Sequence, residues 1–184
     1  VTPRDMITWM KLWHRNLYVA NRDPDLTDQT CKAHGCHDIE NMQHLAQCRI
    51  IRRDYWDRVT RLMQRLELRS PSDWGYRIGG MRMQNSDAFW ILGRVSDNKV
   101  VNNESAGVIA LAWRCLYAEI TKRRIEGGDL KLKSTYARLV GMIISRLKAN
   151  GYRWKRWYHK IQHMTNPQDR KVFPKKSVSY THLT

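Results

Sequence analysis

Hydrophobic residues recur at helical spacing in the first 70 residues, in two stretches separated by the polar loop NRDPDLTDQ. The first stretch opens at Thr2-Pro3, a hydroxyl N-cap followed by proline at the first helical position, and extends to about Tyr18. Its apolar stripe consists of Met6, Trp9, Met10, Trp13 and Leu17. The second stretch covers about 40–68, and its apolar face consists of Leu45, Trp56, Val59, Leu62, Met63 and Leu66. We predict a helix for each stretch.

The second half of the chain has the same periodicity. A third helix is predicted over about 104–124, ending before Gly127-Gly128, with an apolar face of Ile109, Trp113, Leu116, Tyr117 and Ile120. A fourth is predicted over about 133–163, with a seam of Val140, Ile144, Leu147, Gly151, Trp154, Tyr158 and Ile161. Between them, the segment DAFWILGRV fits a short strand or one helical turn equally well. The predicted fold class is therefore mostly α.

Positive charge is concentrated in the last third of the chain. The formal net charge is +16, and residues 121–176 contain sixteen Lys and Arg against three acids. Such a concentration is typical of a surface that binds a polyanion, whereas the alternative is a merely solvated face. The longest apolar runs, such as GVIALAW, are far shorter than the roughly 20 residues that span a bilayer. We therefore expect an intracellular protein that binds nucleic acid and no membrane.

Three of the four cysteines and three of the seven histidines lie within residues 30–48, TCKAHGCHDIENMQHLAQC. Cys31 and Cys36 flank a short loop, and His44 and Cys48 are four residues apart, which places both on one face of a helix. Thiolate and imidazole are ligands that Zn²⁺ prefers, and four protein ligands leave no open position for water. The spacing therefore predicts a structural Zn²⁺ site rather than a catalytic one.

One ligand is open to an alternative. His34 could replace Cys36, because Cys31 and His34 are separated by two residues, although thiolate binds Zn²⁺ more tightly. Cys115 lies in the apolar helix AWRCLYAEI, far along the chain from the cluster. We expect it to be a packed core thiol rather than a fifth ligand.

The segment CKAHGCHDIENMQHLAQC resembles the zinc-binding segment that follows the polymerase domain in non-LTR (LINE-like) retrotransposon reverse transcriptases. The match consists of the Cys pair, Glu40-Asn41, His44-Leu45 and Cys48, followed by RRDYWDRV. Two spacings depart from the family pattern: Cys31 and Cys36 flank four residues rather than two, and His44 and Cys48 flank three rather than four. The resemblance covers about residues 5–65.

The resemblance implies a small zinc knuckle inserted between helices, followed by a helical C-terminal extension. It also implies nuclear localisation and an upstream polymerase domain in the same polyprotein as a partner. The chain has no palm-type Asp pair, no P-loop and no nuclease constellation of paired carboxylates with a Lys. We therefore expect this fragment to be non-catalytic, with RNA-directed DNA polymerase activity belonging to the parent protein.

Two basic segments are candidates for contact with RNA template or target DNA. The first follows the metal ligands, and the second belongs to the fourth predicted helix and includes YRWKRWYHK. In the second, Trp154 and Tyr158 fit the apolar seam, whereas Trp157 could stack on a base or make a peripheral core contact. The Lys and Arg side chains are predicted to contact phosphates. The candidate residues are Arg49, Arg52, Arg53, Arg146, Arg153, Lys155, Arg156, Trp157 and Lys160.

The alternative function is a zinc-stabilised helical protein-interaction or regulatory domain, in which the Trp and Met stripes would dock a partner. Either function fits one division of the chain: a helix plus zinc-knuckle region (1–70), an irregular linker (71–103), a basic helical extension (104–165) and a disordered tail (166–184). The last seven residues, VSYTHLT (178–184), resemble a translated sequencing adapter. We expect both true ends of the protein to lie outside this sequence, and its oligomeric state is not predicted.

Overall fold

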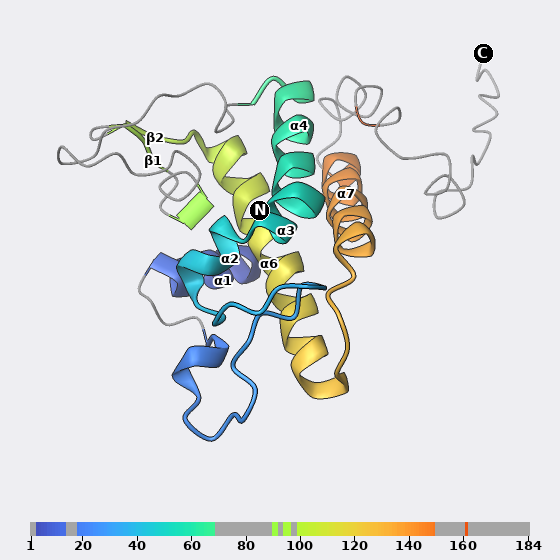
Figure 1. Ribbon diagram of the computed structural model, residues 1–184. Helices are drawn as coiled ribbons and strands as arrows, with labels where there is room; N and C mark the ends of the chain where they lie inside the picture. The colour runs from blue at the N-terminus through green and yellow to red at the C-terminus, as the bar shows by residue number, and fades with distance from the viewer. Residues whose placement is uncertain are drawn as a thin grey trace, which may run out of the picture.

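The computed structural model of the chain describes residues 3–13, 18–68, 90–91, 94–96, 99–149 and 161. Its elements are mostly helices, with one pair of short antiparallel strands (Figure 1). In order they are α1 (Pro3–Trp13), η1 (Ala20–Arg22), α2 (Met42–Gln47), α3 (Arg49–Ile51), η2 (Arg52–Trp56), α4 (Asp57–Arg65), β1 (Arg94–Ser96), β2 (Lys99–Val100), α6 (Asn103–Glu126) and α7 (Leu132–Ala149). The prediction of a mostly α fold with a Cys/His cluster between helices is confirmed.

The predicted helix over 40–68 is not continuous. α2 ends at Gln47 because Cys48 has φ −45° and ψ 120°, outside the helical region. The chain becomes helical again at Arg49 and passes through a π-helical turn, η2, before α4. The predicted apolar face is nevertheless buried throughout: Leu45, Trp56, Val59, Leu62, Met63 and Leu66 are all at most 1% exposed.

α6 is the central helix of the fold, with α1 and α7 packed against it (Figure 1). It begins where the Asn102 side chain accepts a hydrogen bond from the Ser105 N–H, and it ends at Gly127, whose φ is +76°. The predicted bounds of 104–124 are close to those observed. Cys115 is buried, and its sulfur lies 3.5 Å from Met142 Sδ, so the prediction of a core thiol is confirmed.

The apolar stripes of the first and last predicted helices are partly wrong. Trp9 of α1 is buried, but Met10 is 51% exposed, because α1 packs mainly on one helix, α6, and buries a narrow stripe. On α7 the buried stripe is Tyr136, Leu139, Val140 and Ile143, because α7 packs against both α6 and η2. Ile144 and Leu147 are only partly buried, while Trp154 and Tyr158 lie outside the described residues.

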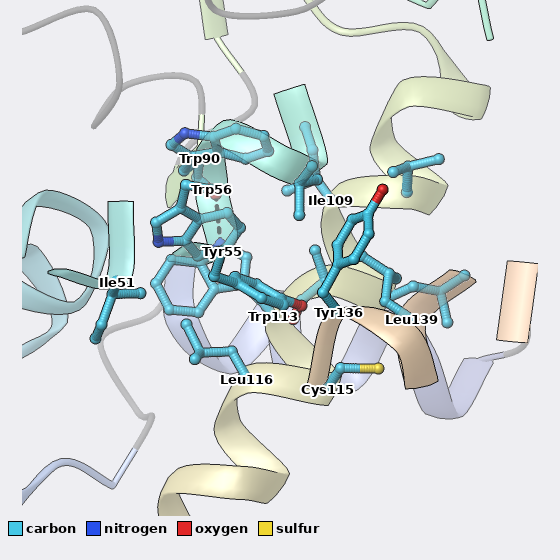
Figure 2. Packing of buried hydrophobic residues seen from close by; sticks show 14 of the residues in the cluster. Ile51, Tyr55, Trp56, Trp90, Ile109, Trp113, Cys115, Leu116, Tyr136 and Leu139 are labelled. Carbon is cyan, nitrogen blue, oxygen red and sulfur yellow. Dashed lines mark hydrogen bonds between the residues drawn. The ribbon is translucent and has the colours of Figure 1, made fainter. Parts of the chain in front are cut away.

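Three tryptophans from distant parts of the chain form the centre of the core (Figure 2). The Trp56 ring stacks on Trp90 with centroids 4.6 Å apart and lies 4.9 Å from Trp113. Two of the indole N–H groups donate to backbone carbonyls: Trp56 Nε1 to that of Leu45 at 3.0 Å, and Trp113 Nε1 to that of Trp90 at 2.7 Å. These contacts join the segment after the Cys/His cluster to α6.

The segment DAFWILGRV contains both structures that its pattern allowed. Trp90 and Ile91 are helical, while Arg94 begins β1, which pairs with β2. Among the described helices, none combines the length and apolarity that a bilayer crossing requires. The tail after residue 161, including the adapter-like segment 178–184, lies outside the described residues.

Candidate metal centre

A tight loop brings the first two candidate ligands together. Thr30 and Ile39 form an isolated antiparallel bridge, and the Cys31 N–H donates to the Asp38 carbonyl at 2.9 Å. Within the loop, the Cys36 N–H donates to the Ala33 carbonyl at 2.8 Å, and Gly35 has φ +76°, which a residue without Cβ adopts freely. The loop thereby turns the Cys31 and Cys36 sulfurs to the same side.

The other two ligands come from the two ends of the short helix α2. Asn41 caps its start, because the Asn41 Oδ1 accepts a hydrogen bond from the His44 N–H at 2.8 Å. Cys48 lies at its end, in the non-helical position between α2 and α3. The expectation that one continuous helix carries His44 and Cys48 is therefore wrong, although both side chains reach the same point.

The four ligand atoms of Cys31, Cys36, His44 and Cys48 all lie within 4.8 Å of one another. Cys36 Sγ is 3.4 Å from His44 Nε2 and 3.7 Å from Cys48 Sγ. The sulfurs of Cys31 and Cys48 belong to residues that are each 3% exposed. One loop and one helix thus supply four donors around a single buried point, and this group could hold a metal ion.

The electrostatics of the cluster favour a thiolate at Cys48. The Cys31 thiol hydrogen-bonds to the Cys48 sulfur, and His44 and the N–H groups of Ile51 and Ile50 also stabilise the charge, so the Cys48 pKa is lowered. The same hydrogen bond, together with burial, raises the pKa of Cys31. The Cys48 thiolate in turn raises the pKa of His44. An ion needs its thiols deprotonated, and Cys48 is the ligand best prepared for it.

The two nitrogens of His44 face different partners. Nε2 faces the sulfurs, whereas Nδ1 lies 3.7 Å from the Asp38 carboxylate. A carboxylate beside the second ring nitrogen of a metal-binding histidine fixes the ring and raises its basicity. Asp38 was not among the predicted site residues, although its position between Cys36 and His44 in the sequence is a usable signal.

His34 does not belong to the cluster. Its side chain is 88% exposed, and its Nδ1 lies 2.7 Å from the Asp129 carboxylate, on the segment between α6 and α7. The alternative in which His34 replaces Cys36 is therefore not supported by the geometry. The physical reason is the turn at Gly35, which directs Cys36 inward while His34 points to solvent.

A buried ion pair holds the metal centre against α6. The Glu40 side chain is fully buried and pairs with Arg124, whose side chain is 9% exposed. Glu40 Oε1 also accepts from the Ala20 N–H at 3.1 Å, and Arg124 donates to the Tyr18 carbonyl at 3.1 Å. Glu40 directly precedes Asn41, the cap of α2, so the pair fixes the helix that carries His44.

Glu40 belongs to the motif that resembles the retrotransposon segment, but its position in the sequence predicts no role for it. Its partner Arg124 is 84 residues away, and no pattern in the chain joins them. A second link supports the same docking: the Leu130 N–H donates to the Lys32 carbonyl at 2.8 Å, inside the ligand loop. The metal centre is thus attached to the segment that connects α6 to α7.

Only some of the residues predicted to contact nucleic acid lie in the part of the chain that the structure describes. Arg49, Arg52 and Arg53 are exposed, and Arg53 pairs with Asp54 at 2.7 Å while Arg52 lies 3.9 Å from Asp57. Arg146 is partly buried on α7. The remaining candidates, Arg153, Lys155, Arg156, Trp157 and Lys160, lie outside the described residues.

Comparison with known proteins does not assign the chain to a family. No family model, no curated protein and no solved structure matches the chain.

Proposed function

We propose that this chain is a non-catalytic, zinc-stabilised nucleic-acid-binding module from the C-terminal part of a non-LTR retrotransposon reverse transcriptase. Its role is to bind RNA template or target DNA behind an upstream polymerase domain of the same polyprotein, in the nucleus. The observation that carries the proposal is the association of a four-donor Cys/His centre with a chain of net charge +16.

The donor set favours zinc as the metal. Three thiolates and one imidazole are soft and borderline ligands, and calcium or magnesium would require oxygen donors. With four protein donors, the ion would be a cross-link between the loop 31–36 and α2, and its binding energy would be folding energy. The residues that would hold it are Cys31, Cys36, His44 and Cys48.

The distribution of charge supports a polyanionic partner. Within the described part of the chain, several exposed basic residues form no ion pair: Arg49, Arg61, Arg65, Lys131, Lys133 and Arg138. They lie on the helix that follows the metal centre and around the first half of α7, which packs against η2. Unpaired surface cations on neighbouring helices are suited to phosphate contacts.

A salt titration tests the proposal. The reduced, zinc-loaded chain is mixed with a fluorescently labelled 30-nucleotide RNA of mixed sequence, and anisotropy is measured between about 50 and 300 mM salt. Binding through phosphates predicts that log K falls linearly with log salt, with a slope of about −0.7 for each contact. Absence of binding at about 50 mM salt would contradict the proposal.

The second candidate is a zinc-stabilised helical protein-interaction or regulatory domain. It is favoured by two apolar side chains on α1, Ile7 and Met10, which are 48% and 51% exposed. In that case the charge would serve solubility, and the titration above would show no binding. Replacing Ile7 and Met10 with Gln separates the two candidates, since only the interaction domain would lose its function.

A further inference from the structure

The helical segment from Arg49 to Arg65 has an exposed side that is dense in arginine. Ile51, Tyr55, Val59, Leu62 and Met63 on its inner side are completely buried. Its exposed arginines are Arg49, Arg52, Arg53, Arg61 and Arg65. Only the first three were predicted as nucleic-acid contacts, and the sequence pattern gives no reason to group them with the last two.

The π-helical turn η2 changes how these arginines are aligned. In an uninterrupted α-helix each residue advances by about 100°, so Arg49 and Arg61 would be about 120° apart around the axis. A π-helical turn accommodates one extra residue. The helix after η2 is therefore rotated back by about 100°, and Arg61 comes to within about 20° of Arg49. Arg65, four residues after Arg61, lies only about 40° further around the axis, and Arg53 lies inside η2, four residues after Arg49.

The four arginines form two pairs with the same spacing along the helix. Arg49 and Arg53 are four residues apart, as are Arg61 and Arg65, which corresponds to a rise of about 6 Å in each pair and about 24 Å overall. Arg49, Arg61 and Arg65 form no ion pair within the described residues, whereas Arg53 is paired with its neighbour Asp54. Asp57 lies on the same side, four residues from both Arg53 and Arg61, and faces Arg52 at 3.9 Å.

The arginine side continues toward α7. The Arg58 guanidinium lies 5.8 Å from the centroid of the Tyr136 ring on α7. Asp54 has a lowered pKa because Arg53 hydrogen-bonds to it, and the charges of Arg58 and Lys133 contribute in the same direction. Lys133 of α7 therefore lies close enough to the helix to extend the same positive field.

We propose that Arg49, Arg53, Arg61 and Arg65 form a stripe of two cation pairs, one on each side of Asp57, that binds the phosphodiester backbone of a nucleic acid, and that the π-helical turn η2 is what aligns them. The inference rests on the proposed function and identifies its primary contact surface. Backbone contacts of this kind position a strand without reading its sequence, so the stripe binds all sequences alike.

The test compares two double variants of equal charge. Arg61→Gln with Arg65→Gln removes two stripe cations, while Lys11→Gln with Lys122→Gln removes two exposed cations on α1 and α6. Both are titrated with salt on the 30-nucleotide RNA described above. The stripe variant is expected to reduce the salt slope by about 1.4, from about 0.7 per lost contact, while the control leaves it unchanged. Circular dichroism confirms that both variants are folded.

A set of single variants tests the alignment itself. Arg49 and Arg61 lie on one side of the helix only because of η2, so Arg49→Gln and Arg61→Gln are each expected to lower the slope by about 0.7, while Lys11→Gln on α1 leaves it unchanged. Equal slopes for the stripe and control double variants, with tight salt-dependent binding by the wild type, would overturn the stripe and keep the proposed function. Failure of the wild-type chain to bind would overturn both.

Discussion

Arg124 of α6 forms a buried ion pair with Glu40, the residue before Asn41, which caps the helix carrying His44. The guanidinium also lies 5.6 Å from the centroid of the Tyr18 ring and donates to the Tyr18 carbonyl. The candidate metal centre is therefore fixed to the central helix by a charge pair whose carboxylate is fully buried. This arrangement makes the stability of the centre depend on α6.

Removing either partner alone should be costly, because the other charge would be left buried and unpaired. We expect Glu40→Ala and Arg124→Ala each to lower the free energy of unfolding by about 3–5 kcal/mol, measured by urea denaturation. The double variant Glu40→Ala with Arg124→Ala should lose less than the sum of the two. Additive losses would show that the pair is not energetically coupled.

The chain should bind one Zn²⁺, and Cys48→Ser should abolish stoichiometric binding because it removes the preferred thiolate. Metal content is measured by mass spectrometry on reduced, dialysed protein. Cys115→Ala is the matched control, since Cys115 is a core thiol beside Met142 and should leave the zinc content unchanged. Wild-type protein without stoichiometric zinc would refute the assignment.

His34 should be dispensable for the metal. Because its ring faces Asp129 and is largely exposed, His34→Ala should keep one Zn²⁺ per chain, whereas His44→Ala should lose it. A competition titration with a chromogenic zinc chelator compares the two affinities. Loss of zinc in the His34 variant would return this residue to the ligand set.

The acid sensitivity of the fold should depend in part on Glu119. Burial alone would raise its pKa, but the Arg123 side chain and the Lys131 N–H donate to the carboxylate and lower it below its ordinary value. A carboxyl with a lowered pKa stabilises the fold above its ordinary pKa, and this contribution is lost as the pH falls through the folded value. Between pH 7 and about pH 3, the melting temperature of the wild type should therefore fall more than that of Glu119→Gln. Parallel curves would contradict this, and loss of metal affects both proteins alike.

Trp56 should be the most sensitive aromatic residue of the core. Its ring contacts both Trp90 and Trp113, and its Nε1 donates to the carbonyl of Leu45 in α2, the helix that carries His44. Trp56→Ala should lower the free energy of unfolding by about 3–5 kcal/mol, while Trp56→Phe should cost less because it keeps most of the ring contacts. Urea denaturation of the two variants against the wild type measures the difference.

The sequence by itself determined most of the helical segments and the candidate ligands. Local signals are sufficient for a helix such as α6, because its apolar periodicity and the Gly127-Gly128 pair predict bounds of 104–124, close to the observed Asn103–Glu126. Spacing likewise favoured the four candidate metal donors, since all lie within eighteen residues, whereas the exclusion of His34 required the turn at Gly35.

Features that depend on contacts between distant parts of the chain were decided only by the tertiary structure. Met10 belongs to an apolar stripe in the sequence, yet it is half exposed because too little of the fold covers α1. The break at Cys48 and the π-helical turn η2 depart from regular helical hydrogen bonding, which residue periodicity does not encode. The pairing of Glu40 with Arg124 joins residues 84 positions apart, and local sequence carries no signal for a charge pair that exists only once the ligand loop is packed against α6.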